Sequence, residues 1–193
     1  MDIIKIYYDL ETTGLDFRKN GIHQIAGIIE VNDVEVDNFN FLVQPNPKAQ
    51  INPKALELCG VTLEQVQNYA PMKEVHRRLT ETLARYVNRF DRKQKAHLVG
   101  FNNRKFDDNF LRAWFSQCGD KYFGSWFWPN TIDVMGLASE YLIYARPDMK
   151  NFKLKTLAKH FGIPVEPEKL HTGDYDVLLT RRIYEIVTDR DLI

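Results

Sequence analysis

The sequence predicts one α/β domain in which a mixed central β-sheet is flanked by α-helices. Three segments rich in Ile, Val, Phe and Tyr have strand character and come first, at 3–10, 24–31 and 36–44. Beyond residue 96 a further strand-like segment alternates with helical patterns, which is typical of a mixed sheet with helices on its faces. A chain of 193 residues buries one sizeable core and is short for two, so residues 1–193 are predicted to form a single domain.

Each predicted element has its own signal in the sequence. Asn32 and Asp33 separate the second and third strands and indicate a hairpin turn. The stretch 44–53 is rich in turn residues, and the short apolar run 97–101 is typical of a buried strand. Helical periodicity is expected over 72–90, 106–117, 134–144, 154–161 and 173–187.

Composition excludes several classes of protein without indicating a partner. The 26 basic side chains are balanced by 26 acidic ones, so the overall charge does not indicate binding to nucleic acid. Cys59 and Cys118 lie far apart in the sequence, which excludes a disulfide framework and a zinc-finger spacing. No secretory signal is visible, and no segment approaches the ~20 apolar residues that span a bilayer. We therefore expect a cytoplasmic protein that does not bind membranes, while its oligomeric state is left open.

The stretch YYDLETTGL places Asp9 and Glu11 one residue apart at the end of the first strand. Residues i and i+2 of a strand share a face and lie roughly 6.5–7 Å apart. Two like charges on one face repel each other. Either this pair is a solvated strand end, or a cation lies between the two carboxylates.

The stretch FNNRKFDDNFLRAWF puts two further acids at the start of a predicted helix. At 100° per residue, Asp107 falls near the centre of an apolar stripe that includes Phe110 and Trp114, whereas Asp108 points toward solvent. An alternative is that both acids stabilise the N-terminus of the helix through its dipole. That alternative explains Asp108 well and Asp107 only in part.

The stretch HTGDYDVLLTRRIYEIV repeats this arrangement in the last helix. Asp176 falls close to the inward face, while Asp174 points roughly the other way. His171 precedes the helix by about one turn, and Thr172 is positioned to cap it. Single acids such as these usually have a structural explanation, but acids on a strand end and on two inward helix faces are hard to explain by solvation.

Convergent carboxylates indicate a particular chemistry. Four of them cannot all remain ionised close together without cations. Oxygen ligands from Asp and Glu suit Mg²⁺ or Mn²⁺ rather than zinc. Two such ions ~3.5–4 Å apart stabilise the attacking and leaving oxygens of a phosphoryl displacement. A neutral histidine can take the proton from the attacking water, and His171 is the candidate for that role.

The strings DLETTGL and NRKFDDNFL, followed by His171 and Asp176, resemble the three motifs of the DEDDh exonucleases. These are DnaQ-like enzymes with a ribonuclease H-like fold. The order and spacing match, and NPKALELCGVT, NTIDVMGLA and LKTLAKHFGI extend the resemblance from about residue 4 to 187. The resemblance implies a metal-dependent 3′–5′ exonuclease that acts on the 3′ ends of single-stranded nucleic acid, with DNA favoured over RNA. It also implies release of nucleoside 5′-monophosphates and a setting such as proofreading or DNA repair.

The resemblance further implies a role for each motif residue. Asp9, Glu11 and Asp176 would bind the ion that holds the water, Asp9 would also bridge to a second ion, and Asp107 would complete the site. His171 would be the general base. A second set of residues would hold the terminal nucleotide, with Leu15 wedged against a base: Thr12, Thr13, Gly14, Leu15 and Asn103.

Two residues depart from the pattern of the family. Cys59 and Asn102 stand where many relatives have histidine, which bears on substrate preference rather than on the reaction. The alternative function is a degraded family member that binds nucleic acid or a protein without hydrolysis, and the complete set of five motif residues argues against it. No tail for docking a DNA polymerase is evident, which favours a free-standing exonuclease or a shortened chain.

Several other features have competing explanations. Four histidines lack ligand spacing and are expected to be structural or at the surface: His23, His76, His97 and His160. Five basic residues could contact phosphates or be solvated: Arg104, Lys105, Lys150, Lys153 and Lys155. The aromatic segment 122–128 could stack on bases or contact a partner, but core packing beneath the edge of the sheet is favoured.

Overall fold

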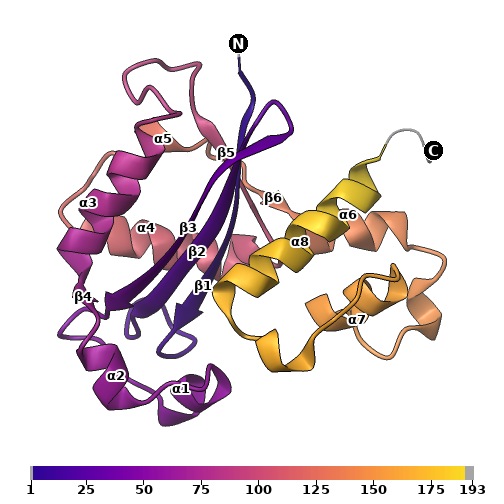
Figure 1. Cartoon of the computed structure of the whole chain (residues 1–193), viewed down its shortest axis with the longest axis horizontal. Helices are drawn as coiled ribbons and strands as arrows, with labels where there is room; N and C mark the ends of the chain where they lie inside the picture. Colours follow the sequence, from indigo (N-terminus) through magenta and orange to yellow (C-terminus); the bar gives the residue numbers. More distant parts are fainter. Residues whose placement is uncertain (1, 190–193) are drawn as a thin grey trace.

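The computed structural model describes residues 2–189 and confirms the predicted fold, a mixed sheet between helices (Figure 1). Within these residues the sheet has the strand order β4-β3-β2-β1-β5-β6. Strands β1, β2 and β3 form an antiparallel meander, β5 runs parallel to β1, and β6 runs parallel to β5. The strands are β1 (Ile4–Thr12), β2 (Ile22–Val31), β3 (Val34–Gln44), β4 (Ala70–Pro71), β5 (Ala96–Gly100) and β6 (Ile132–Asp133).

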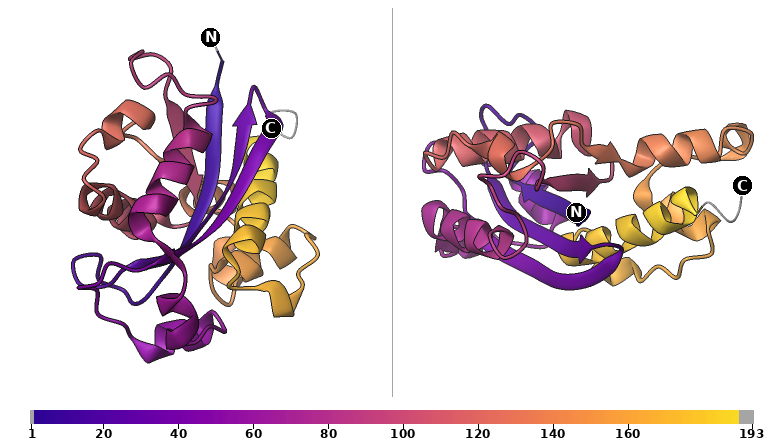
Figure 2. Two further views of the ribbon diagram at one scale, coloured as in Figure 1. Left: turned by 60° about the vertical axis from the view of Figure 1, so that its left-hand side comes forward. Right: turned by 90° about the horizontal axis from the view of Figure 1, so that it is seen from above.

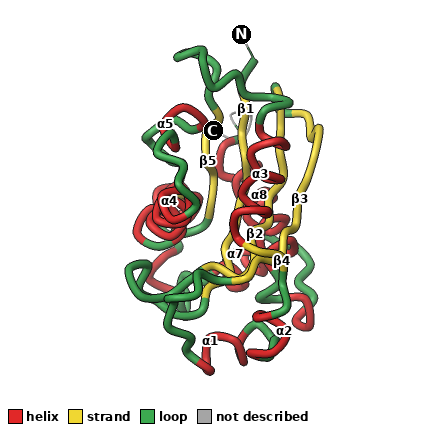
Figure 3. The backbone as a smooth tube through the Cα atoms, turned by 90° about the vertical axis from the view of Figure 1, so that its left-hand side faces the viewer, coloured by secondary structure: helices red, strands yellow, loops and turns green. Residues whose placement is uncertain are grey.

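Helices cover both faces of the sheet (Figure 2). One apolar core is formed with α3, α4 and α5, and a second with α6, α7 and α8. Two short helices, α1 and α2, lie beyond the end of the sheet at which β1 finishes (Figure 3). The helices are α1 (Pro53–Leu58), α2 (Leu63–Gln67), α3 (Met72–Leu83), α4 (Asp107–Gln117), α5 (Phe123–Trp126), α6 (Val134–Tyr141), α7 (Leu154–His160) and α8 (Gly173–Thr188).

Successive side chains of strand β1 point alternately into the two apolar cores. Ile6, Tyr8 and Leu10 belong to the core beneath α3 and α4, whereas Tyr7 belongs to the core beneath α8. Odd-numbered residues therefore face α8, because successive side chains point to opposite faces of a sheet. This parity directs Asp9 and Glu11 toward α8.

The pairing of β1 with β5 covers only part of the strand. It runs from Ile4 opposite Ala96 to Tyr7 opposite Val99, while β2 pairs with β1 along its whole length. Among the described residues, the β5 side of β1 therefore has no strand partner beyond Tyr7, and α4 begins beside this free edge.

The predicted hairpin turn is confirmed. Asn32 and Asp33 have φ values of 53° and 66° between two antiparallel strands, which is the conformation of a type I′ turn. Asn and Asp tolerate this left-handed conformation better than other non-glycine residues do.

The long helix predicted over 72–90 is wrong in its second half, because α3 ends at Leu83. The side chains of Asn88 and Asp91 accept hydrogen bonds from backbone N–H groups two residues further on, at 3.1 and 2.9 Å. Such local turns compete with the helical ladder. The helix predicted over 134–144 likewise ends earlier, at Tyr141.

Helices α1 and α2 were not predicted, although the sequence carries signals for both. Asn52 caps α1 and is followed by Pro53 at the first helical position. Thr62 and Gln65 form a capping box at the start of α2. Helices this short have no apolar periodicity that would reveal them.

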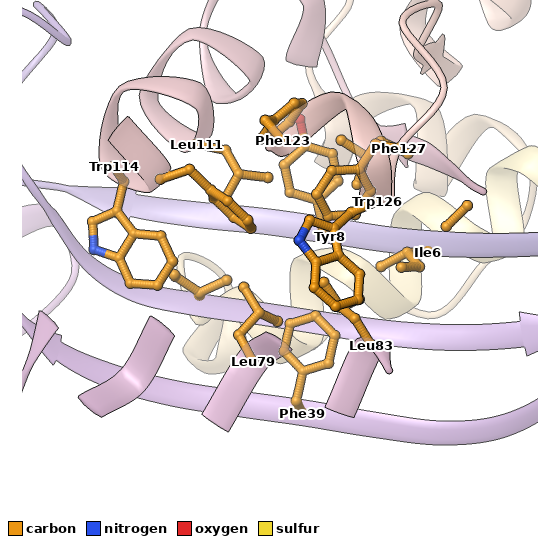
Figure 4. Packing of buried hydrophobic residues seen from close by; sticks show 14 of the residues in the cluster. Ile6, Tyr8, Phe39, Leu79, Leu83, Leu111, Trp114, Phe123, Trp126 and Phe127 are labelled. Atoms are coloured by element: carbon orange, nitrogen blue, oxygen red, sulfur yellow. The ribbon is translucent and has the colours of Figure 1, made fainter. Parts of the chain in front are cut away.

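The aromatic segment 122–128 packs as predicted beneath the edge of the sheet. Phe123, Trp126 and Phe127 are buried in the same core as Trp114 and Leu111 (Figure 4). Phe123 also contacts Phe115 edge-to-face, with ring centroids 5.1 Å apart. Tyr122 and Trp128 are exceptions, since 62% of Tyr122 is exposed and Trp128 is half-buried, where it stacks on His97.

Candidate active site

Three predicted acids meet where β1 approaches the start of α8. Oxygen atoms of Asp9, Glu11 and Asp176 lie within 4.8 Å of one another. Asp9 and Glu11 come from β1, and Asp176 comes from the first turn of α8, which lies against the end of the strand (Figure 1). The inward direction predicted for Asp176 is confirmed, and Asp174 is exposed as expected.

Gly173 permits this close approach of α8 to the sheet. A Cβ atom on Gly173 would lie 3.0 Å from Cβ of Ala26 in β2 and 3.8 Å from Oδ2 of Asp9. A contact of 3.0 Å is tighter than most Cβ contacts. A larger residue would therefore push the first turn of α8, with Asp176, away from the strand.

Asp107 reaches the site from the free edge of β1. It is 6% exposed in the first turn of α4, so the prediction that it faces inward is confirmed. The backbone of Leu10 in β1 acts to lower the pKa of Asp107, which places this carboxylate beside the strand. Its charge in turn raises the pKa of Asp9.

The carboxylates of the site disfavour each other's charge. Burial raises the pKa of Asp9 well above its usual range, and the charges of Asp107, Glu11 and Asp176 raise it further. Burial also raises the pKa of Glu11 to about 7 and that of Asp107 to about 8. The same cause raises the pKa of Asp176.

These properties fit divalent cations bound by oxygen. Within the described chain, Oδ1 of Asp176 is buried and has no hydrogen-bond partner. Buried carboxylates that repel one another are stabilised by a positive charge between them. Asp and Glu oxygens are the ligands that Mg²⁺ and Mn²⁺ prefer.

His171 lies at the rim of this cluster. It is exposed, directly precedes the capping residue of α8, and has a left-handed backbone with φ of 64°. Its charge and its backbone both lower the pKa of Asp176, so it is close to that carboxylate. Thr172 occupies the N-cap position as predicted but makes no capping hydrogen bond, and its hydroxyl donates to the carbonyl of Lys169 at 2.5 Å.

Asp108 is not exposed, which corrects the prediction from the helical periodicity. It is 9% exposed, and both of its carboxylate oxygens accept hydrogen bonds. One bond comes from the hydroxyl of Tyr8, and the other from Oγ1 of Thr131 at 2.7 Å. The first turn of α4 is covered by β1 and by the segment that precedes β6, so its burial extends beyond the apolar stripe.

The loop after Glu11 is held by its threonines. Thr13 is fully buried, and its hydroxyl donates to the carbonyl of Gln50 at 2.8 Å and accepts from the N–H of Gly21 at 2.9 Å. The hydroxyl of Thr12 donates to the carbonyl of Gly14 at 2.8 Å. A Cβ atom on Gly14 would lie 2.5 Å from the side-chain amide of Asn20, so this position requires glycine.

The remaining two predicted substrate residues differ in exposure. Leu15 is 86% exposed at the tip of the same loop, where it is free to contact a ligand. Asn103 is fully buried, and neither polar atom of its side-chain amide has a hydrogen-bond partner among residues 2–189.

Cys59 belongs to the site more closely than the sequence indicated. It follows α1, and its thiol donates a hydrogen bond to Oε2 of Glu11 at 3.0 Å. The sequence indicated only that Cys59 bears on substrate preference. The available signal was the position of Cys59 in a motif of the family. The sequence carried no signal for its contact with Glu11.

Four histidines lie outside the cluster, as expected. His23 is buried within β2, His76 faces Asp120 at 3.3 Å, and His97 stacks on Trp128. His160 is exposed at the end of α7. Separately, no helix within residues 2–189 is long and apolar enough to cross a membrane.

Curated relatives share this domain within much longer chains. The chain is 28% identical over 181 residues to DNA polymerase III PolC-type from Thermotoga petrophila. It is 30% identical over 162 residues to the protein of the same name from Clostridium perfringens. These alignments cover 93% and 83% of the chain but only 11% and 10% of the respective polymerases.

Solved structures share the fold. E. coli Exonuclease I in complex with a dT13 oligonucleotide superposes with a TM-score of 0.76 and 20% identity, over 98% of this chain and 42% of the other. Exonuclease I from Methylocaldum szegediense has the same TM-score and identity and is matched over 41% of its chain. This similarity supports the ribonuclease H-like architecture. Residues 6–184 match the sequence profile of the RNase_T exonuclease family, so the chain belongs to this family of phosphodiester hydrolases.

Proposed function

We propose that residues 1–193 form a single DEDDh exonuclease domain that removes nucleotides from the 3′ ends of single-stranded DNA. The products are nucleoside 5′-monophosphates. The observation that carries this proposal is the convergence of Asp9, Glu11 and Asp176, with the buried Asp107 close enough to raise the pKa of Asp9. An acidic cluster of this kind requires cations at neutral pH.

Two Mg²⁺ or Mn²⁺ ions are the cofactors that the donor set favours. Asp9, Glu11 and Asp176 would hold one ion, and Asp9 with Asp107 would hold the other. When bound, such a pair stabilises the charge on the attacking and leaving oxygens of the phosphodiester. The protein contributes rigidity, because β1 supplies two of the ligands from a strand that is paired along its length with β2.

His171 is the general base of this proposal. Its exposure and its proximity to Asp176 support contact with a water molecule and with the scissile phosphate. A neutral imidazole near pH 7 can accept the proton of that water. The neighbouring carboxylate would stabilise the imidazolium that forms.

The loop of Thr12, Thr13, Gly14 and Leu15 would bind the terminal nucleotide. Its threonines hold the backbone, and Leu15 is exposed for contact with a base. Asn103 would also belong to this subsite. Because it is buried, it would act by supporting the turn before α4. Single-stranded DNA is the favoured substrate, since the relatives named above include DNA polymerases and an exonuclease solved with dT13. The polymerases also favour a setting in proofreading or repair.

The test uses a single-stranded DNA labelled at its 5′ end, with Mg²⁺ or Mn²⁺. We expect a ladder of shortened products from the 3′ end, and no ladder with the Asp9→Asn variant purified in parallel. A matched RNA oligonucleotide measures sugar preference. If every oligonucleotide remains uncut with either ion, the chain is a binding module rather than an enzyme.

A further inference from the structure

We propose that Tyr8, Asp108 and Thr131 form a positioning cluster that holds Asp107 in register with Asp9. This inference rests on the proposed function, because it concerns the geometry of the same metal site. The three residues are buried, with exposed fractions of 3%, 9% and 4%. None of them has the position of a ligand, since Tyr8 points to the face of β1 opposite to Asp9 and both oxygens of Asp108 are engaged by Tyr8 and Thr131.

The cluster is adjacent to the site in both elements that it joins. Tyr8 immediately precedes Asp9 in β1, and Asp108 immediately follows Asp107 in α4. The hydroxyl of Tyr8 donates directly to the carboxylate of Asp108. The hydrogen bond from Tyr8 to Asp108 therefore joins the two residues that are the immediate chain neighbours of Asp9 and Asp107.

Thr131 fixes the other side of Asp108. Its hydroxyl donates to the second carboxylate oxygen at 2.7 Å, and its carbonyl accepts from Nε of Arg104 at 3.3 Å. Arg104 lies in the short helical turn that leads into α4. The start of α4 is thus tied to β1 on one side and to the segment before β6 on the other.

Other restraints on the start of α4 within residues 2–189 are limited, and they include the backbone of Leu10 in β1, which also contacts Asp107. The first turn of α4 has no side-chain cap, and β5 stops pairing with β1 at Tyr7. Meanwhile the charges of Asp107 and Asp9 repel each other. Without the hydrogen bonds to Asp108, the repulsion would favour movement of α4 away from the strand, and Asp107 would leave the site.

Calorimetric titration of the metal-free protein with Mn²⁺ tests this role. Tyr8→Phe removes only the hydroxyl, and Asp108→Leu removes both acceptors with little change in size. We expect each to raise the dissociation constant about tenfold or more, and the double variant to add little to Asp108→Leu, because that substitution already breaks the bond from Tyr8. Asp108→Asn should restore near-normal binding, since its amide can accept from Tyr8 and donate to Thr131.

Tyr7→Phe is the matched control. Tyr7 is the neighbouring residue of β1, is fully buried, and donates its hydroxyl to Glu30 at 3.1 Å on the other face. It should lose thermal stability to a similar extent and bind Mn²⁺ normally. Hydrogen exchange in the first turn of α4 should accelerate in Tyr8→Phe and not in Tyr7→Phe.

The results separate positioning from a merely structural role. Positioning predicts that kcat falls with KM unchanged in Tyr8→Phe, and that excess Mn²⁺ restores much of kcat. Normal Mn²⁺ binding and normal exchange in both Tyr8→Phe and Asp108→Leu would overturn the proposal, as would an equal loss of affinity in Tyr7→Phe. A wild-type protein that binds Mn²⁺ without cutting any substrate would refute the proposed function alone, because binding and exchange would still decide the role of Asp108.

Discussion

The thiol of Cys59 lies 3.0 Å from Oε2 of Glu11 and donates a hydrogen bond to it. Burial raises the pKa of Cys59, and the adjacent charge of Glu11 raises it further, so the group remains a protonated donor. In return, this hydrogen bond lowers the pKa of Glu11, which burial raises. The pair joins the end of α1 to β1 at the acidic cluster.

Removal of this donor should shift the pH dependence of cleavage. In Cys59→Ala the pKa of Glu11 rises, so Glu11 is ionised only at higher pH, and the acidic limb of kcat/KM moves upward in pH. Cys59→Ser retains a donor and should keep the wild-type profile. The measurement is kcat/KM against pH in saturating Mg²⁺, with Cys118→Ala as the control at the other cysteine. If the acidic limb of kcat/KM lies at the same pH in Cys59→Ala and in the wild type, the hydrogen bond from Cys59 does not control the ionisation of Glu11.

Asp9→Asn should abolish cleavage and yet stabilise the metal-free protein. The folded state raises the pKa of Asp9 above its unfolded value, so the folded form binds more protons above about pH 4 and its stability falls as pH rises. The substitution removes this repulsion. We expect a rise in Tm of a few degrees, about 1 kcal/mol, that is larger at pH 8 than at pH 5.

The check is scanning calorimetry in EDTA and then in Mn²⁺. Saturating Mn²⁺ should raise the Tm of the wild type at pH 8 and leave Asp9→Asn nearly unchanged. Equal metal-dependent shifts in the two proteins would show that Asp9 is not a ligand.

His171 can be tested without disturbing its backbone. Because its φ is 64°, alanine would introduce strain, whereas asparagine tolerates the left-handed region and cannot act as a base near pH 7. His171→Asn should lower kcat about 10²–10⁴-fold, the usual contribution of a general base. Calorimetry should show Mn²⁺ affinity close to that of the wild type. Loss of ion binding instead would make His171 a ligand.

The sequence predicted the direction of four acidic side chains because each follows a simple periodicity. Strand alternation directed Asp9 and Glu11 to one face, and the apolar stripes of two helices directed Asp107 and Asp176 inward. The burial of Asp108 could not be predicted in this way. An apolar stripe on a helix predicts contact with one neighbouring element. The start of α4 lies between two elements, β1 and the segment before β6.

Boundaries were harder to predict where local side chains compete with the backbone. The turns at Asn88 and Asp91 end the region expected to continue α3, although its apolar residues continue the helical spacing. The contact of Cys59 with Glu11 joins residues 48 apart in the chain, and it depends on the placement of two short helices without periodicity. Such contacts need the tertiary structure.

His23 should make the protein sensitive to acid. It is 1% exposed, neither ring nitrogen has a hydrogen-bond partner in the described chain, and burial lowers its pKa to about 4. The unfolded state therefore binds the additional proton below about pH 6.5, and stability falls as pH decreases from there toward 4. His23→Leu should remove about 2 kcal/mol of this loss at pH 4. Urea unfolding at pH 7 and pH 4 measures this loss of stability, with a substitution of the exposed His160, His160→Gln, as the control. If the stability of His23→Leu depends on pH as that of the wild type does, His23 is not the source of the acid sensitivity.

Leu15 should affect substrate binding without affecting stability. Its side chain is 86% exposed at the tip of the loop that follows Glu11, so truncation removes almost no buried apolar surface. If Leu15 packs against the terminal base, Leu15→Ala should raise KM for single-stranded DNA several-fold, because an apolar contact of this size contributes about 1–2 kcal/mol. Tm and Mn²⁺ affinity should not change. Phe90→Ala is the matched control, since Phe90 is equally exposed at 88% and lies outside the candidate site. An equal KM for Leu15→Ala and the wild type would show that the loop binds the nucleotide through its backbone alone.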